Sequence, residues 1–129
     1  MSREAQTVSD VQHHSHLALK VKNLERSVRF YTEVVGLTVL ERSKPGAPAL
    51  VVLKEGLGLK AAEAGTLSGR GGTVDHVAFR VTSLQPILAR LAAARVPVAD
   101  GPRPSPYGQS VYFLDPDGNK IECHDGDRQ

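Results

Sequence analysis

The sequence predicts an α+β fold made of two βαβββ modules, and an internal repeat is the main observation behind this prediction. Residues 16–24 (HLALKVKNL) align with residues 76–84 (HVAFRVTSL) at an offset of 60. Histidine, alanine, valine and leucine match outright, and Leu/Val, Leu/Phe and Lys/Arg exchanges are conservative. In each copy the histidine begins an alternating stretch typical of a strand, and a stretch with helical period follows. The order of strand and helix is therefore itself repeated.

A helix is expected after each of these strands. Asn23 and Ser83 belong to the residue types that favour the N-cap position, where a side-chain oxygen accepts a hydrogen bond from the first turn. Gly36 is well placed to end the first helix. The apolar residues recur with helical period at Leu24, Val28, Tyr31 and Val35 in the first helix, and at Leu84, Ile87, Leu88 and Leu91 in the second.

Three short apolar strands are expected after each helix. They cover residues 38–41, 49–54 and 57–62 in the first module, and residues 96–99, 110–114 and 120–124 in the second. Residues 44–46 and 54–56 are expected to be turns. The Asp-Pro-Asp-Gly sequence at 115–118 predicts a hairpin turn, for which we expect no functional role.

The expected organisation is a flexible tail over residues 1–13, a first module over 14–63, a glycine-rich linker over 64–73 and a second module over 74–126. The linker lacks the Gly-Lys-Ser/Thr ending and the following helix of a phosphate-binding loop. Each module is too small to be stable alone. The modules are therefore expected to pair with each other or with those of a second chain, as one domain.

Composition excludes several classes of function. The chain has 129 residues, 23% of them charged, with a net charge of +2. Its lysines and arginines are scattered and it has few aromatic residues, which argues against a nucleic-acid surface. No apolar run approaches the roughly 20 residues that span a bilayer, and the N-terminus lacks the apolar region of a secretory signal. With Cys123 as the single cysteine, we expect a cytoplasmic protein that acts on a small molecule.

The histidines indicate a metal site. His16 and His76 occupy the same repeat position, so modules related by a two-fold axis would bring them together. Two imidazoles suit a divalent metal ion, and a carboxylate completes a facial triad. Glu122, on the last predicted strand, is the best candidate for that carboxylate. His14 and His124 each lie two residues from a predicted ligand and can share its face, and His124 is well placed to orient the carboxylate.

Three stretches of the chain resemble one superfamily. The pattern from His16 to Leu37, HLxLxVxNLxxSxxFYxxVxGL, resembles the opening of vicinal oxygen chelate proteins, which include glyoxalases, bleomycin-resistance proteins and extradiol dioxygenases. Asp75-His76-Val-Ala-Phe resembles the start of their second module, and residues 112–122 resemble their closing hairpin. The resemblance implies a U-shaped mixed sheet around a metal groove, with His16, His76 and Glu122 as ligands. It also implies that an oxygen-bearing substrate chelates the metal.

Our first choice within this superfamily is an Fe²⁺-type oxygenase or oxidase of a phenolic or polyketide-like compound. Tyr112 resembles a substrate-contacting tyrosine of the ring-cleaving oxygenases, and Tyr112 or His124 would transfer protons. The metal triad is equally suited to Mn²⁺, Ni²⁺ or Zn²⁺. We expect a homodimer, in which exchange of modules would combine His16 of one chain with His76 and Glu122 of the other.

Three alternatives remain open. The first is an Mn²⁺-dependent fosfomycin-type thiol transferase or epoxide-opening enzyme, which residues 112–118 and 122–127 resemble although most of the phosphonate-binding residues are missing. Whichever reaction applies, the candidate substrate contacts are Arg103 and Ser105, on the loop before the closing hairpin, and Ser110. The second is a glyoxalase-type lyase, whose fourth ligand falls at Ala62 by the repeat offset, with Glu63 or His14 as substitutes. The third is a non-catalytic antibiotic-binding resistance protein, against which the absence of tryptophan argues.

Overall fold

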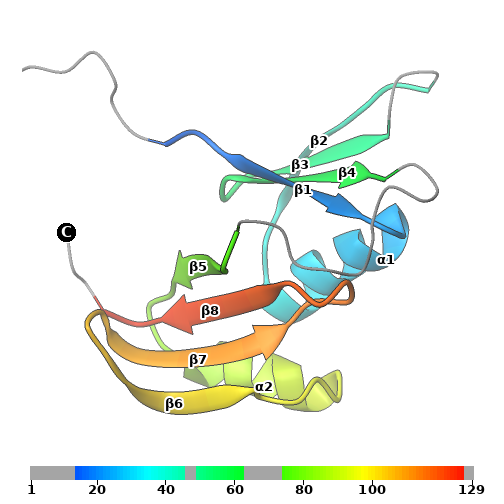
Figure 1. Ribbon diagram of the computed structural model, residues 1–129. Helices are drawn as coiled ribbons and strands as arrows, with labels where there is room; N and C mark the ends of the chain where they lie inside the picture. Colours follow the sequence, from blue (N-terminus) through cyan, green and yellow to red (C-terminus); the bar gives the residue numbers. More distant parts are fainter. Residues whose placement is uncertain (1–13, 46–48, 63–73, 127–129) are drawn as a thin grey trace, which may run out of the picture.

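The computed structural model describes residues 14–45, 49–62 and 74–126, and it confirms two βαβββ modules (Figure 1). The predicted tail over 1–13, the predicted linker over 64–73 and Glu63 lie outside the described residues. The first module contains β1 (Leu17–Val21), α1 (Leu24–Arg29), the π-helix η2 (Phe30–Val35), β2 (Val39–Arg42), β3 (Leu50–Leu53) and β4 (Leu57–Ala61). The second contains β5 (Val77–Arg80), α2 (Gln85–Ala93), β6 (Asp100–Ser105), β7 (Gly108–Leu114) and β8 (Lys120–His124).

The two modules have the same sheet topology. The first sheet has the strand order β1-β4-β3-β2 and the second has the order β5-β8-β7-β6. In each sheet the first strand runs parallel to the last, and the other neighbours are antiparallel. The helix between the first and second strands supplies the crossover that a parallel pair needs. The repeat in the sequence is therefore a repeat of the complete module.

The first helix begins and ends as predicted. The side-chain oxygen of Asn23 accepts a hydrogen bond from the amide of Arg26 at 3.0 Å. After α1 the helix widens into η2, and the amide of Gly36 bonds to the carbonyl of Tyr31 at 3.0 Å, five residues back. Gly36 has φ +97°, a conformation in which a side chain would be strained. The second helix begins one residue later than predicted, since Leu84 is its N-cap and the hydroxyl of Ser83 accepts only from the amide of Gln85.

One strand prediction was wrong. Residues 96–99 form no strand, and the pairing with β7 begins at Asp100 instead. Pro102 and Pro104 disfavour a strand here, because proline cannot donate to a sheet. The structure tolerates them because β6 is an edge strand whose register shifts between Asp100 and Arg103. Arg103 and Ser105 are consequently strand residues and not loop residues.

One continuous core joins the two modules. It contains apolar residues of both sheets and of all three helical segments. In the second sheet, Val111, Phe113, Ile121 and Cys123 are buried with residues of α2. Side chains alternate between the faces of a sheet, so the intervening residues of β7 and β8 line the opposite face. None of the helices in the described residues is long and apolar enough to cross a membrane.

The turn at residues 115–118 has a larger structural role than a hairpin alone. Asp115 is buried and accepts a hydrogen bond from the hydroxyl of Tyr31 at 2.6 Å. Asp117 accepts bonds from the amide of Lys22 and the hydroxyl of Ser27, and it lies 3.5 Å from the guanidinium of Arg26. The turn thus fastens the hairpin of β7 and β8 to the first helix.

Candidate metal centre

Two of the three predicted metal ligands meet on the polar face of the second sheet. His76 directly precedes β5, and Glu122 lies on β8, the parallel neighbour of β5. His76 Nε2 is 3.1 Å from Glu122 Oε1. Glu122 is only 2% exposed, and no lysine or arginine of the described residues makes an ion pair with it. The burial of an ionised carboxylate without a cationic partner is costly, so this pair is suited to a bound cation.

The orientation of the imidazole also fits a metal ion. His76 Nδ1 donates to Asp75 Oδ2 at 2.7 Å, and in the neutral ring this leaves the lone pair of Nε2 directed toward Glu122. A carboxylate behind a histidine ligand commonly fixes the ring in this way. The same hydrogen bond holds the pKa of the Asp75 carboxyl below its usual range. An imidazole nitrogen and a carboxylate oxygen that face each other at 3.1 Å are a donor set that would suit one divalent ion.

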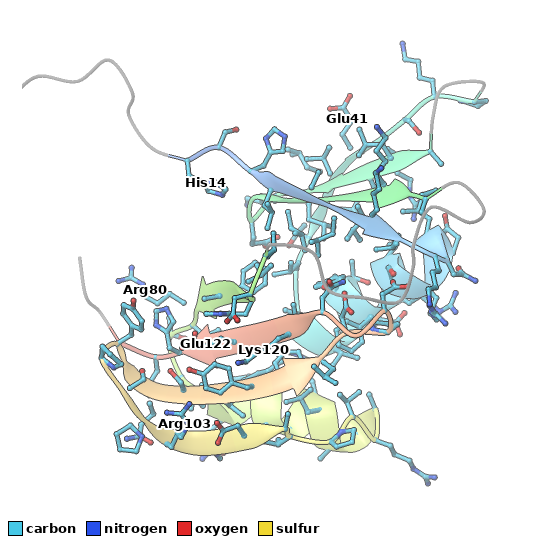
Figure 2. All side chains as sticks on the ribbon, viewed as in Figure 1. His14, Glu41, Arg80, Arg103, Lys120 and Glu122 are labelled. Atoms are coloured by element: carbon cyan, nitrogen blue, oxygen red, sulfur yellow. The ribbon has the colours of Figure 1, made fainter. Side chains whose placement is uncertain are left out.

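The third predicted ligand lies elsewhere in the same chain. His16 directly precedes β1, is exposed, and has Nδ1 3.1 Å from the hydroxyl of Ser15. His14 is also exposed and lies at the start of the first sheet, away from Glu122 (Figure 2). Within the described residues, no three His, Cys, Asp or Glu side chains gather closely enough to hold a metal ion. A single chain therefore assembles the His76–Glu122 part of the predicted triad.

The predicted serine contacts face Glu122. Ser110 on β7 donates from its hydroxyl to Glu122 Oε2 at 2.7 Å. The hydroxyls of Ser110 and Ser105 are also 2.7 Å apart. His124, predicted to orient the carboxylate, instead stacks on Tyr107 at 5.0 Å between ring centroids. Its Nδ1 atom is buried without a hydrogen-bond partner among the described residues.

Tyr112 lies next to the pair and is flanked by cations. It is opposite Glu122 in the register of β7 and β8, and its ring centroid is 6.3 Å from that of His76. The guanidinium of Arg103 lies 5.1 Å from the Tyr112 ring and the ammonium of Lys120 lies 5.3 Å from it. Figure 2 shows Arg103, Lys120 and Glu122 on this one sheet. The hydroxyl of Tyr112 makes no hydrogen bond within the part of the chain that the structure describes.

Lys120 and Asp75 were missed as site residues by the sequence analysis. Lys120 alternates with Glu122 and His124 on one strand, and strand period places all three on one face. Asp75 adjoins a predicted histidine ligand, a common arrangement at metal sites. Arg103 was predicted on a loop, but it lies on β6 and pairs with Asp100 at 2.9 Å. That hydrogen bond raises the pKa of Arg103 above its usual value.

The register also corrects the position predicted for a fourth ligand. Ala78 faces Glu122 in the second sheet, and the equivalent Ala18 faces Gly58 in the first. Gly58, and not Ala62, therefore corresponds to Glu122 in the first module. A glycine has no side chain with which to bind a metal, so this position supplies no fourth carboxylate.

The chain belongs to the Glyoxalase/Bleomycin resistance protein/Dioxygenase superfamily, whose family model matches residues 13–123. The glutathione transferase FosA of Serratia marcescens is 36% identical over 115 residues, covering 87% of this chain and 79% of that protein. The metallothiol transferase FosB of Lysinibacillus sphaericus is 30% identical over 122 residues, covering 92% and 86%. Both similar proteins are transferases by name.

A solved structure shares the fold over nearly the whole chain. The glyoxylase/bleomycin resistance protein/dioxygenase domain from Frankia sp. EAN1pec superposes with a TM-score of 0.73 and 28% sequence identity, covering 93% of this chain and 99% of that one. The resemblance seen in the sequence is thus confirmed for family and fold. The first choice of an Fe²⁺ oxygenase finds no support in the similar transferases, which favour the thiol-transferase alternative.

Proposed function

We propose that this protein is a divalent-metal-dependent transferase that adds a thiol to a small, anionic, oxygen-bearing substrate. The observation that carries the proposal is the pairing of exposed His76 with buried Glu122, with 3.1 Å between its facing atoms, in a chain 36% identical to a glutathione transferase. Mn²⁺ is our first choice of metal because the fosfomycin-type enzymes that the sequence resembles use it. This choice replaces the Fe²⁺ oxygenase expected from the sequence.

Each residue of such a site would have a separate role. His76 and Glu122 would hold the ion, and Asp75 would keep Nε2 of His76 directed toward it. A bound divalent ion would supply Lewis acidity to a substrate oxygen. Tyr112, whose hydroxyl is not engaged by the described residues, would donate a hydrogen bond to the substrate beside the ion.

Arg103 and Lys120 support an anionic substrate. They flank the Tyr112 ring at 5.1 and 5.3 Å, on the same face as Glu122. Asp100 partly compensates Arg103, whereas Lys120 forms no ion pair with any described residue. A phosphonate or carboxylate group would be attracted to these cations by charge-assisted hydrogen bonds. They would take the place of the phosphonate-binding residues that the sequence lacks.

A second copy of the chain would complete the ligand set. His16 immediately precedes β1 and His76 immediately precedes β5, and neither strand pairs along its outer edge with another described strand. A homodimer with exchanged modules would place His16 of one chain beside His76 and Glu122 of the other. The edges of β1 and β5 give such a dimer two matching strands to bring together.

The experiment is a thiol-consumption assay with the metal-loaded dimer. Fosfomycin and other anionic epoxides are mixed with glutathione or cysteine, and loss of free thiol is followed with formation of an adduct by mass spectrometry. We expect Mn²⁺-dependent turnover that Glu122→Gln abolishes and that the distant Ser43→Ala retains. Oxygen uptake with Fe²⁺ and catechols, together with an absence of thiol adducts across the panel, would contradict the proposal.

A further inference from the structure

A chain of hydrogen bonds leads from the turn between β6 and β7 to the buried carboxylate. The amide of Tyr107 donates to the hydroxyl oxygen of Ser105 at 3.1 Å. The Ser105 and Ser110 hydroxyls are 2.7 Å apart, and the Ser110 hydroxyl is 2.7 Å from Glu122 Oε2. One continuous path therefore leads to Glu122 on β8 from Tyr107 in the turn, through Ser105 on β6 and Ser110 on β7.

The direction of this chain follows from the protons available. An amide can only donate and an ionised carboxylate can only accept, while each serine hydroxyl carries one proton. The Ser110 proton goes to the carboxylate of Glu122, so it cannot also go to Ser105. The Ser105 proton then goes to Ser110 at 2.7 Å in preference to its more distant acceptor, the carbonyl of Gly108 at 3.4 Å. Every proton points toward the carboxylate, which is the arrangement that best stabilises its negative charge.

Burial makes Glu122 dependent on these hydroxyls. Ser110 is fully buried and Glu122 is 2% exposed. The two carboxylate oxygens have different partners, since Oε2 accepts from Ser110 while Oε1 faces His76. With Oε2 held by a donor, the carboxylate presents Oε1 toward the place where the ion would bind.

We propose that Ser110, supported by Ser105, is a positioning residue that holds Glu122 so that one oxygen alone is presented to the metal. The inference rests on the metal site of the proposed function. It assigns to Ser110 and Ser105 an action on the ligand in place of the direct substrate contacts expected from the sequence. Loss of a partner behind a metal ligand typically lowers metal affinity by about 10- to 100-fold.

The test measures Mn²⁺ affinity directly, without substrate. Free Mn²⁺ is followed by electron paramagnetic resonance as it is titrated into the full-length dimer. We expect Ser110→Ala to weaken binding by about 10- to 100-fold and Ser105→Ala by less, because the latter keeps the bond between Ser110 and Glu122. Ser110→Thr retains the hydroxyl and should restore most of the affinity.

The matched control is Ser43→Ala, which removes a hydroxyl that accepts from the amide of Leu50 in the other sheet. A second readout is the visible spectrum of the Co²⁺ form, which reports ligand geometry and should change in Ser110→Ala but not in the control. Metal-free unfolding curves test for a general loss of structure. If Ser110→Ala is too unstable to purify, the Mn²⁺ affinity and the Co²⁺ spectrum of Ser105→Ala are measured instead.

The outcomes separate the two proposals. Equal Mn²⁺ affinity and an unchanged Co²⁺ spectrum in the Ser110→Ala and Ser105→Ala variants would overturn this inference while leaving thiol transfer intact. A wild-type dimer that binds neither ion would overturn the metal site and the inference together. Weakened metal binding without any thiol-transfer activity in the wild type would support the inference and contradict the proposed reaction.

Discussion

At the scale of single residues, Tyr31 and Asp115 form the most buried polar contact between the modules. Tyr31 is fully buried in the first helix, and its hydroxyl donates to Asp115 Oδ2 at 2.6 Å. Asp115 also accepts from the amides of Asp117 and Asn119 and from the side chain of Asn119. Burial and the neighbouring Asp115 carboxylate raise the pKa of Tyr31 above its ordinary value.

We predict that Tyr31→Phe lowers the free energy of unfolding by about 1–3 kcal/mol, because a buried carboxylate loses a donor. The raised pKa means that this contribution is fully present below about pH 10, the ordinary tyrosine pKa, and is lost as the pH rises above it. Urea unfolding of both proteins at pH 8 and pH 11 measures the difference, which should shrink at the higher pH.

Absorbance at 295 nm provides a second measurement of the same effect. While both proteins remain folded at pH 11, wild type and Tyr31→Phe should show equal phenolate absorbance, because Tyr31 stays protonated. An excess of one tyrosine's absorbance in the wild type would show that Tyr31 ionises in the folded protein and would contradict the prediction.

At the scale of elements, the turn between β6 and β7 is held against the end of β8. The amide of Gln109 donates to Asp125 Oδ1 at 2.8 Å, and the amide of Asp125 donates to the carbonyl of Gln109 at 3.1 Å. Gly126 packs so closely on the turn that an added Cβ would overlap the main-chain oxygen of Tyr107. The turn directly follows Ser105 and carries Tyr107, so its position also affects the hydrogen bonds that reach Glu122.

We predict that Gly126→Ala destabilises the protein by about 1–3 kcal/mol through overpacking and also weakens Mn²⁺ binding. The displaced turn would separate Ser105 from Ser110 and disturb the stack of Tyr107 on His124. Urea unfolding and Mn²⁺ titration measure the two effects. Gly118→Asn is the control, since a Cβ at Gly118 meets nothing within 4 Å and asparagine tolerates a left-handed backbone. Equal stability of Gly126→Ala and wild type would contradict the prediction.

The elements show what the sequence could and could not predict. Helix positions followed from the N-cap at Asn23 and the apolar period, because these signals are local. The position of β6 did not, because its pairing depends on β7 across a shifted register, which overrides two prolines. The position predicted for a fourth ligand, Ala62, was also wrong, because the two modules differ in length. Leu17 faces Leu57 but Val77 faces Ile121, so the second module holds four more residues between its first and last strands.

The candidate site, like the fold, could be predicted only where local sequence signals determine it. The repeat pointed to His76, and its place on the last predicted strand made Glu122 the best candidate carboxylate. The structure brings these two together because they lie on neighbouring parallel strands. The bond of Ser110 to Glu122 and the flanking of Tyr112 by Lys120 require side-chain packing across strands, which sequence spacing does not encode. The location of His16 depends on how the modules assemble, so no local pattern could determine its partner.

At the scale of the whole molecule, the two modules of one chain pack through their helical segments. Arg90 on α2 donates to the carbonyls of Val34 and Val35 at 2.8 and 3.0 Å, across the end of η2. The turn at 115–118 fastens the second hairpin to the first helix. This packing uses the helices of both modules, and it leaves the outer edges of β1 and β5 unpaired with any other described strand.

A dimer with exchanged modules would behave differently from a protein whose sites are each built within one chain. In the proposed dimer each site takes His16 from one chain and His76 with Glu122 from the other. A His16→Ala chain and a His76→Ala chain would each be inactive and metal-deficient as homodimers, because every site would lack one histidine. In a mixed dimer, one site would lack both His16 and His76, and the other site would contain all of the wild-type ligands.

We therefore predict that unfolding and refolding an equal mixture of the two variants restores about one quarter of the wild-type Mn²⁺ sites, because half of the dimers are mixed and half of their sites are intact. Mn²⁺ stoichiometry and thiol-transfer activity should recover together. Each variant refolded alone is the control and should recover neither. If every site were built within one chain, no mixture could restore binding, and a refolded mixture without Mn²⁺ sites would contradict the exchanged dimer.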